Sequence, residues 1–280
     1  MTNIGQVTGD GLRELPAQPG RLSQLGWLAH DSAVMAKRSL TVTFRRPAIV
    51  VFAILQPAMF VLVFRFVFGG AIHPPGHISY IDYLMAGILV QTTAFNAVAG
   101  AMGFAAEKGN GIIDRFRTLP MSHGAILIGR ITGNLVRNLV TIVILVLLGW
   151  ALGFSPHLGI GLLGALCLLV VFGFALSWVG ALLGLSVGSQ EAAQSAGFVL
   201  IWPLVFVSSA FVPASTMPSG LRAFVSNQFF THVVDAERDL LLGHPTGSQA
   251  WLAVAWCLGI GLLFMLLAAR TFGRLRSIPR

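Results

Sequence analysis

The stretch that decides the fold runs from Glu107 to Arg130 and reads EKGNGIIDRFRTLPMSHGAILIGR. It is a polar segment in a very apolar chain, and the apolar runs on both sides of it are long enough to cross a membrane. Glycines interrupt its beginning at Gly109 and Gly111, and Pro120 ends its first half. The stretch therefore predicts a short structured segment between two transmembrane helices.

Between these breaks the residues form an amphipathic pattern. Three apolar side chains can share one helix face, because residues three and four positions apart are neighbours on a helix surface. They are Ile112, Ile113 and Phe116, and the charged residues Asp114, Arg115 and Arg117 fall largely elsewhere. Two interpretations follow: a soluble partner docks on this segment, or the segment is a solvated basic loop that only orients the protein in the membrane.

Composition places the rest of the chain in a bilayer. Of its 280 residues, 55% are hydrophobic and 10% are charged, whereas soluble domains carry about 25% charged residues. The net charge of +8 is spread beside apolar runs, which excludes a nucleic-acid partner as its explanation. Cys167 and Cys257 lie in apolar runs without a CxxC motif, so we expect neither disulfides nor a metal site. His73 and His77 have ligand-like spacing, but they lie in a proline-containing turn.

The expected fold is an all-α polytopic membrane protein with six transmembrane helices. The predicted spans form one transmembrane domain over residues 48–269 and cover 48–68, 83–105, 125–154, 158–187, 196–211 and 250–269. In the fourth span, small residues spaced by seven and four predict a face for close helix packing. They are Gly173, Gly180, Gly184 and Gly188.

The flanking segments are predicted from their polarity and amphipathic character. Residues 1–23 are expected to be a disordered cytoplasmic tail, and 24–46 an amphipathic helix in the cytoplasmic interface. Residues 270–280 form a basic cytoplasmic tail. Between the fifth and sixth spans, residues 212–248 predict two short helices that are external or re-entrant into the outer leaflet.

Polar and aromatic side chains inside the spans mark candidate residues for a translocation path. Buried amides need partners in hydrocarbon, so they either line a path or join helices, and helix joining is the more ordinary role. The candidate residues are Gln56, Phe60, Phe64, Gln91, Asn96 and Trp202. In the third span, Arg130 and Arg137 are seven residues apart and share a face. Since an arginine inside a span is costly unless it faces protein, we expect Arg137 to point at a partner subunit or an inward cavity.

The positive charges fix the expected orientation. With both termini in the cytoplasm, 14 of the 18 basic residues lie on the cytoplasmic side. The external loops hold only Arg222 and Arg238. Six spans with both ends inside satisfy this asymmetry.

At this point the residues resemble the permeases of type-2 ABC transporters. The central stretch is similar to that family's signature: a glutamate after the second span, a glycine-containing break, a basic amphipathic stretch and Leu-Pro-x-Ser. These are Glu107, Gly109, Gly111, Asp114–Arg117, Leu119, Pro120 and Ser122. A second likeness is to Asn-Pro-x-Thr followed by an alanine–x–arginine stretch and Leu-x-x-Gly. It falls on Asn227, Thr231, Ala236, Arg238 and Leu240–Gly243, with Gln228 in place of the proline. The resemblance is closest to the daunorubicin-resistance branch of drug and lipid exporters.

The resemblance implies a multi-pass protein of the bacterial plasma membrane. It would export a hydrophobic or amphiphilic drug, lipid or secondary metabolite as one half of a homodimer or a related heterodimer. Each half would contact a separately encoded ATPase, which binds ATP and Mg²⁺, through a coupling helix at about Gly111–Leu119 and through the N-terminal interfacial helix. The path would run between two permeases, lined chiefly by the first, second and fifth spans. The contact residues implied are Glu107, Gly111, Ile112, Ile113, Asp114, Arg115, Phe116, Arg117, Leu119 and Pro120.

The chain contains no GxxxxGK[ST] sequence, so it is not expected to be an enzyme or to bind a cofactor itself. A polysaccharide or glycolipid exporter of the same superfamily remains an alternative. An ion-coupled secondary transporter would need an intramembrane carboxylate relay, and Asp82, Glu107 and Glu191 lie only at the ends of spans. A membrane-embedded enzyme is disfavoured because the histidines are scattered over both predicted sides.

Overall fold

The computed structural model describes residues 30–38, 40–41, 45, 47–70, 78–117 and 123–274. Within these residues every regular element is a helix. The predicted tail at 1–23, residues 275–280, the turn that holds His73 and His77, and residues 118–122 lie outside the described part. The predicted basic tail at 270–280 begins later than expected, because residues 270–274 continue the last helix, Gly247–Arg274.

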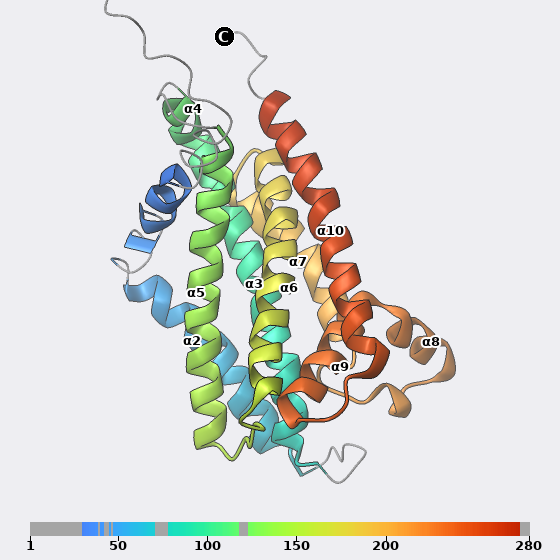
Figure 1. The fold of residues 1–280 in the computed structure, drawn as a ribbon. Helices are drawn as coiled ribbons and strands as arrows, with labels where there is room; N and C mark the ends of the chain where they lie inside the picture. Colours follow the sequence, from blue (N-terminus) through green and yellow to red (C-terminus); the bar gives the residue numbers. More distant parts are fainter. Residues whose placement is uncertain are drawn as a thin grey trace, which may run out of the picture.

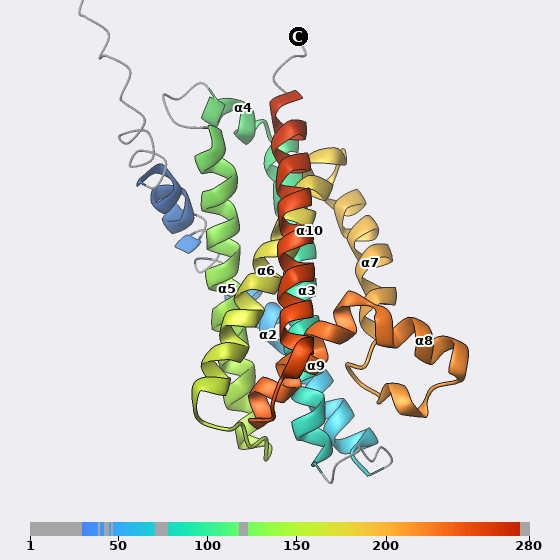
Figure 2. The same ribbon diagram turned by 45° about the vertical axis from the view of Figure 1, so that its right-hand side comes forward.

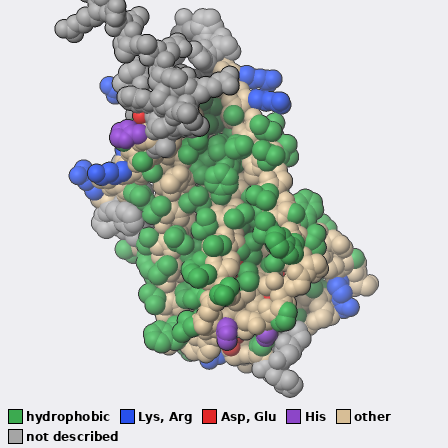
Figure 3. Space-filling model, viewed as in Figure 1, with side chains coloured by type: hydrophobic (Ala, Val, Ile, Leu, Met, Phe, Trp, Pro, Cys, Tyr) green, Lys and Arg blue, Asp and Glu red, His purple; other side chains and the backbone are tan. Residues whose placement is uncertain are grey.

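Four long helices form the bundle. They are α3 (Tyr80–Gly109), α5 (His123–Ala151), α6 (Ile160–Ser186) and α10 (Gly247–Arg274), and each is long and apolar enough to cross a membrane. They stand side by side in Figure 1. Hydrophobic side chains cover the long sides of the face in Figure 3, and the lysines and arginines visible there lie toward its ends. This distribution is typical of helices surrounded by lipid.

The second predicted span, α3, is the centre of the molecule. In its most apolar segment 83% of the residues are buried, against 22% for α10. It packs against α5, α6, α7 and α9. Glycines of α6 bring the two backbones together: a Cβ at Gly180 would lie 2.5 Å from the carbonyl oxygen of Ala97, and one at Gly184 would collide with that of Ala101. The predicted small-residue face is thus confirmed at these two positions, whereas nothing lies within 4 Å of a Cβ at Gly188.

Two predicted spans are short helices. α2 (Pro47–Val63) continues into a π-helical turn, η1 (Phe64–Phe68), and α7 is Gln190–Phe206. At 17 residues, α2 and α7 each rise about 26 Å. Neither satisfies the criteria of length and composition for crossing a membrane that the four long helices satisfy. Six membrane spans therefore stay a prediction, and four helices have the required length.

Some helix boundaries differ from the predicted ones for identifiable reasons. α7 begins at Gln190 rather than 196, because the Ser189 hydroxyl accepts a hydrogen bond from the Ala192 amide and caps the helix. The polar segment that the sequence favours as a turn is thus the first turn of this helix. α5 ends at Ala151 rather than 154, just before Gly153 adopts a positive φ of 99°.

The two ends of the bundle carry different short elements. α4 (Ile112–Arg117), the helical residues 30–38 and the last turns of α10 lie toward one end, called here the α4 end. α8 (Ser219–Asn227) and α9 (Phe229–Leu242) lie toward the other, the α9 end (Figure 2). Two short helices between α7 and α10 are therefore confirmed. α8 is largely exposed, but α9 packs against α3, α6 and α10.

The helical residues 30–38 lie within the predicted interfacial helix and contact α5. A Cβ at Gly129 would meet Met35 and the backbone of Ser32 and Ala36. Ala36 is buried, while Lys37 and Arg38 are exposed. The amphipathic pattern therefore gives this segment an apolar side that packs on the bundle.

Candidate functional site

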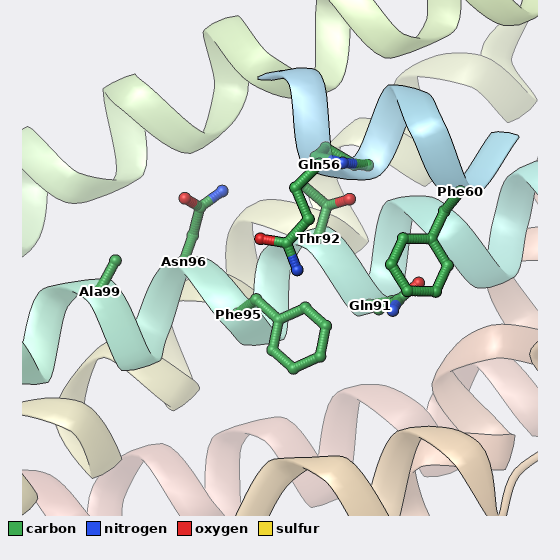
Figure 4. Close-up of a pocket in the computed structure, with 8 residues that line it drawn as sticks. Gln56, Phe60, Gln91, Thr92, Phe95, Asn96 and Ala99 are labelled. Carbon is green, nitrogen blue, oxygen red and sulfur yellow. The ribbon is translucent and has the colours of Figure 1, made fainter. Parts of the chain in front are cut away.

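A pocket between α2 and α3 collects most of the predicted path residues. It has a volume of about 110 Å³ and is lined by Gln56, Pro57, Phe60, Gln91, Thr92, Phe95, Asn96 and Ala99. Figure 4 shows two of the labelled side chains coming from α2 and the others from α3. Gln56, Phe60, Gln91 and Asn96 are four of the six predicted path residues. The sequence thus anticipated residues of two helices that the fold brings together.

The amides at this pocket differ in their bonding. Asn96 donates from Nδ2 to Oδ1 of Asn138 at 2.7 Å, and Asn138 donates in turn to the Thr93 hydroxyl at 3.2 Å. Asn96 therefore also joins α3 to α5. By contrast, Nε2 of Gln91 and Oγ1 of Thr92 are buried without a hydrogen-bond partner among the described residues. Unpaired polar atoms at a pocket wall favour a polar ligand group or water there.

The two remaining path residues, Phe64 and Trp202, belong to a row of aromatic rings beside the pocket. From α7, the Trp202 ring contacts Phe95 at 6.2 Å and stacks on Phe206 at 4.6 Å between centroids. Phe206 stacks on Phe211 at 5.4 Å, and Phe211 stacks on Phe64 at 4.7 Å. We call the connected rings the aromatic row: Phe198, Phe95, Trp202, Phe206, Phe60, Phe211, Phe64 and Phe68. Trp202 and Phe206 are 44% and 37% exposed, so the row also forms an outer surface.

The pocket is small relative to drug-sized sites. Sites for drug-sized ligands enclose roughly 300–1,000 Å³, whereas this one encloses about 110 Å³. A single chain in this conformation therefore holds only part of such a ligand. The exposed rings next to the pocket offer apolar surface for the remainder.

The central segment forms α4, as its pattern predicts, at the junction of α3 and α5. Gly111, which precedes it, has a positive φ of 66°, a conformation that glycine adopts easily. Ile113 is buried in a cluster with Phe104 and Ile126 of the same chain. Ile112 is partly buried and Arg115 is exposed. The side chains of Asp114, Phe116 and Arg117, together with Leu119 and Pro120, lie outside what the structure describes.

Glu107 ties three elements together at the α4 end. Its carboxylate forms an ion pair with Arg130 of α5 and a second one, at 3.6 Å, with Arg38 of the N-terminal helix. Next to it, Lys108 donates to the carbonyl oxygens of Leu185 and Val187 at 2.6 and 3.1 Å. These charged contacts join the end of α3, just before α4, to α5, α6 and the N-terminal helix.

A second polar network, absent from the predicted site residues, lies at the α9 end. Arg238 donates from Nη1 to Asp235 at 2.7 Å and from Nη2 to the carbonyl of Ser209 at 2.9 Å. Its guanidinium stacks 3.7 Å from the ring centroid of Tyr83, whose hydroxyl donates to the same carbonyl. The side-chain amide of Gln228 donates to the carbonyl of Val207. Residues of the second motif thus hold the chain reversal after α7 against α3. The resemblance of this motif to the family could have indicated that these residues matter.

One carboxyl group lies deeper than the sequence indicated. Glu237 of α9 is completely buried, and neither carboxylate oxygen has a hydrogen-bond partner among the described residues. Burial raises the pKa of this carboxyl well above its usual range. Glu237 lies in a charged amphipathic segment, so its sequence context did not indicate that it would be buried.

The fold and these sites define a multi-pass α-helical membrane protein with a polar junction at one end. Residues 32–242 match the family described as ABC-2 type transporter. The chain is 33% identical over 211 residues to the daunorubicin resistance ABC transporter permease protein DrrB1 of Streptomyces coeruleorubidus, covering 75% of this chain and 74% of that protein. It is 25% identical over 248 residues to the probable doxorubicin resistance ABC transporter permease protein DrrC of Mycobacterium tuberculosis, covering 86% and 88%. It is also 25% identical over 213 residues to the putative transport permease ycf38 of Cyanophora paradoxa, covering 74% and 72%.

The match covers most of the chain and includes both motifs, so the chain belongs to the ABC-2 type transporter family. The relatives named as permeases are subunits that are not themselves enzymes, and the family implies an ABC ATPase as partner and a membrane environment.

Proposed function

We propose that this chain is the membrane-spanning permease subunit of an ABC exporter. It moves a hydrophobic or amphiphilic molecule outward, using ATP that a separate subunit binds with Mg²⁺ and hydrolyses. The observation that carries this proposal is the family match over residues 32–242, which contains both α4 and the pocket with its aromatic row. The names of two relatives refer to daunorubicin and doxorubicin resistance, which favours a drug or drug-like metabolite as cargo.

The proposed arrangement keeps six spans, which are the four long helices together with α2 and α7. Both termini lie in the cytoplasm of a bacterial cell, so the α4 end is cytoplasmic and the α9 end external. Support comes from the placement of α4 and the end of α10 together, opposite α8 and α9 (Figure 2). A second permease, identical or related, faces the aromatic row and closes the path that one copy leaves open.

Coupling would run from the ATPase through α4. In this proposal Ile112 and Arg115 take part in the docking surface, while the buried Ile113 anchors α4 to its own bundle. Glu107 acts inside the chain, because its carboxylate already binds Arg130 and Arg38. Displacement of α4 would then tilt α3 and α5 together and change the width of the pocket between α2 and α3. Asp114, Phe116 and Arg117 are proposed as further contacts on sequence grounds.

The test is reconstitution with the ATPase encoded beside this chain. Co-purification and ATP hydrolysis in nanodiscs are measured for the natural chain, for Arg115→Glu and for Phe116→Ala. Arg222→Glu is the matched control, because Arg222 is an exposed arginine on α8 at the opposite end. We expect stimulated hydrolysis that the α4 variants lower at least about tenfold, since charge reversal in a docked contact costs more than about 1.4 kcal/mol. Full complex formation and stimulation by both α4 variants would contradict docking through α4.

A further inference from the structure

Arg137 carries a positive charge that nothing in the described part of the chain neutralises. It lies on α5, two helical turns from Arg130 toward the middle of the helix. Its Nε and Nη2 atoms are buried and have no hydrogen-bond partner among the described residues. The residue as a whole is only partly buried, so part of its side chain is accessible from outside the bundle.

The carboxylates of the surrounding long helices are already engaged, and Asp31 of the N-terminal helix that packs on α5 has a partner as well. α2, α5 and α6 contain no acidic residue, and α3 contains only Asp82 and Glu107. Glu107 binds Arg130 and Arg38, which uses both of its oxygens. Asp82 lies at the opposite end of α3 and accepts hydrogen bonds from Ser79 and Ser155. The charge of Arg130 repels that of Arg137. An anion is therefore the missing component.

The pocket lies at the same level of the bundle as Arg137. On α5, Asn134 reaches Gly100 of α3, and Asn138 bonds to Asn96. Arg137 falls between these contacts in sequence, so it lies at the level of residues 96–100 of α3. Asn96 and Ala99 from that segment line the pocket, and α2 packs against both α3 and α5 there. A ligand held at Arg137 would thus lie at the level of Asn96 and Ala99, two of the residues that line the pocket.

We propose that Arg137 binds the acidic headgroup, a phosphate or a carboxylate, of an amphiphile that enters between α2 and α5. A guanidinium presents paired N–H donors that match two oxygens of either group. The apolar part of the molecule would extend along the aromatic row. The inference that this amphiphile is the cargo depends on the proposed function, whereas its binding at Arg137 does not.

The test measures lipid binding by the full-length chain without an ATPase. Phosphatidylglycerol and phosphatidylcholine are titrated separately into the detergent-purified protein, and bound lipid is counted by native mass spectrometry. The variants are Arg137→Gln, Arg137→Lys and the control Arg270→Gln, an exposed arginine on α10 near the α4 end. We expect the natural chain and Arg270→Gln to prefer phosphatidylglycerol by about tenfold or more. Arg137→Gln should abolish this preference, and Arg137→Lys should keep most of it.

Two further probes distinguish the source and chemistry of the anion. Inorganic phosphate in phosphatidylcholine nanodiscs tests a free anion, and oleate tests a carboxylate, with the thermal unfolding midpoint as readout. A rise in the thermal unfolding midpoint that occurs in the natural chain and not in Arg137→Gln identifies the ligand. In neutral lipid, Arg137→Gln should be at least as stable as the natural chain, because it loses an unpaired buried charge.

The proposal is overturned if Arg137→Gln prefers phosphatidylglycerol as the natural chain does, or if Arg270→Gln loses as much preference. If Arg137→Gln does not fold, the test rests on the natural chain alone. In that case the site is overturned if none of these anions shifts the thermal unfolding midpoint of the natural chain. A chain that binds phosphatidylglycerol through Arg137 but never stimulates an ATPase would keep this inference and contradict the proposed function.

Discussion

At the scale of single residues, Arg137 and Glu237 each bury polar side-chain atoms that have no hydrogen-bond partner among the described residues. They differ in what can satisfy them. Arg137 is only partly buried and lies at the level of the pocket residues Asn96 and Ala99, so a ligand can reach it. Glu237 is completely buried on α9, which packs against α3, α6 and α10, so protonation is the way to lower its energy.

Glu237 should make stability depend on pH in a defined direction. Its pKa is raised by burial, so the folded state holds a proton that the unfolded state releases above about pH 4.3. Stability is then highest below that pH and falls by about 1.4 kcal/mol per pH unit until the pKa of the folded state is reached. We expect the thermal unfolding midpoint of the natural chain in detergent to fall from about pH 5 to about pH 8.

Glu237→Gln is the matched variant, because it keeps the shape of the side chain and removes its titration. It should unfold at a higher temperature than the natural chain at pH 8 and show a flatter profile. A small slope remains from Asp239, whose pKa is also raised by burial. Parallel profiles for the two proteins would show that Glu237 does not hold a proton in the folded state.

At the scale of elements, the contact between α3 and α6 decides how the bundle is assembled. Gly184 admits the backbone of α3 so closely that a Cβ there would collide with the carbonyl of Ala101 and lie 2.7 Å from Cβ of Phe104. Two helices can approach in this way only where a side chain is absent. α3 is therefore the central helix of the bundle, and both the pocket and the α9 network contain residues of α3.

Gly184→Val should destabilise the protein through this contact. The added side chain must push α6 away from α3, and overpacking of this kind costs about 1–3 kcal/mol or more. Gly188→Val is the control on the same stretch, because nothing lies within 4 Å of a Cβ there. The thermal unfolding midpoint in detergent should fall for Gly184→Val and change little for Gly188→Val. Equal midpoints for the two variants would contradict the close α3–α6 packing.

At the scale of the whole molecule, the two ends of the bundle have separate roles in the proposed exporter. The α4 end carries the ion pairs of Glu107, and the α9 end carries the network of Arg238. α3 connects them directly, since Tyr83 near its beginning contacts Arg238 and Glu107 near its end binds Arg130. In the proposed exporter, α3 is the element that would carry a change from one end to the other.

The proposed topology predicts that these ends face opposite sides of the membrane. Single cysteines are introduced at Ser226 of α8 and at Gly273 of α10, both exposed, after replacing Cys167 by serine and Cys257 by alanine. In intact cells, a membrane-impermeant thiol reagent should label Ser226→Cys and leave Gly273→Cys unlabelled until the cells are opened. Labelling of both sites in intact cells would contradict the orientation.

The sequence by itself determined the class of this protein and much of its local structure. Long apolar runs require helices that satisfy their own backbone groups in lipid, and the glycines and Pro120 around residues 107–120 mark the short helix between them. The two motifs also sufficed to place the chain in its family. Four of the six candidate path residues lie on one pocket, and their role in a translocation path stays a prediction. These features depend on periodicity and composition within short stretches of chain.

Only the tertiary structure decided which distant residues meet. Phe206 and Phe211 join the aromatic row because the chain reverses after α7, and Ile113 is buried because α4 brings it into a cluster with Phe104 of α3 and Ile126 of α5. Glu237 is buried because α9 lies among three helices, although its own segment is charged. Arg137 is unpaired because the nearby carboxylate of Glu107 is bound to Arg130 and Arg38. Such outcomes depend on the packing of whole helices, which local hydropathy does not specify.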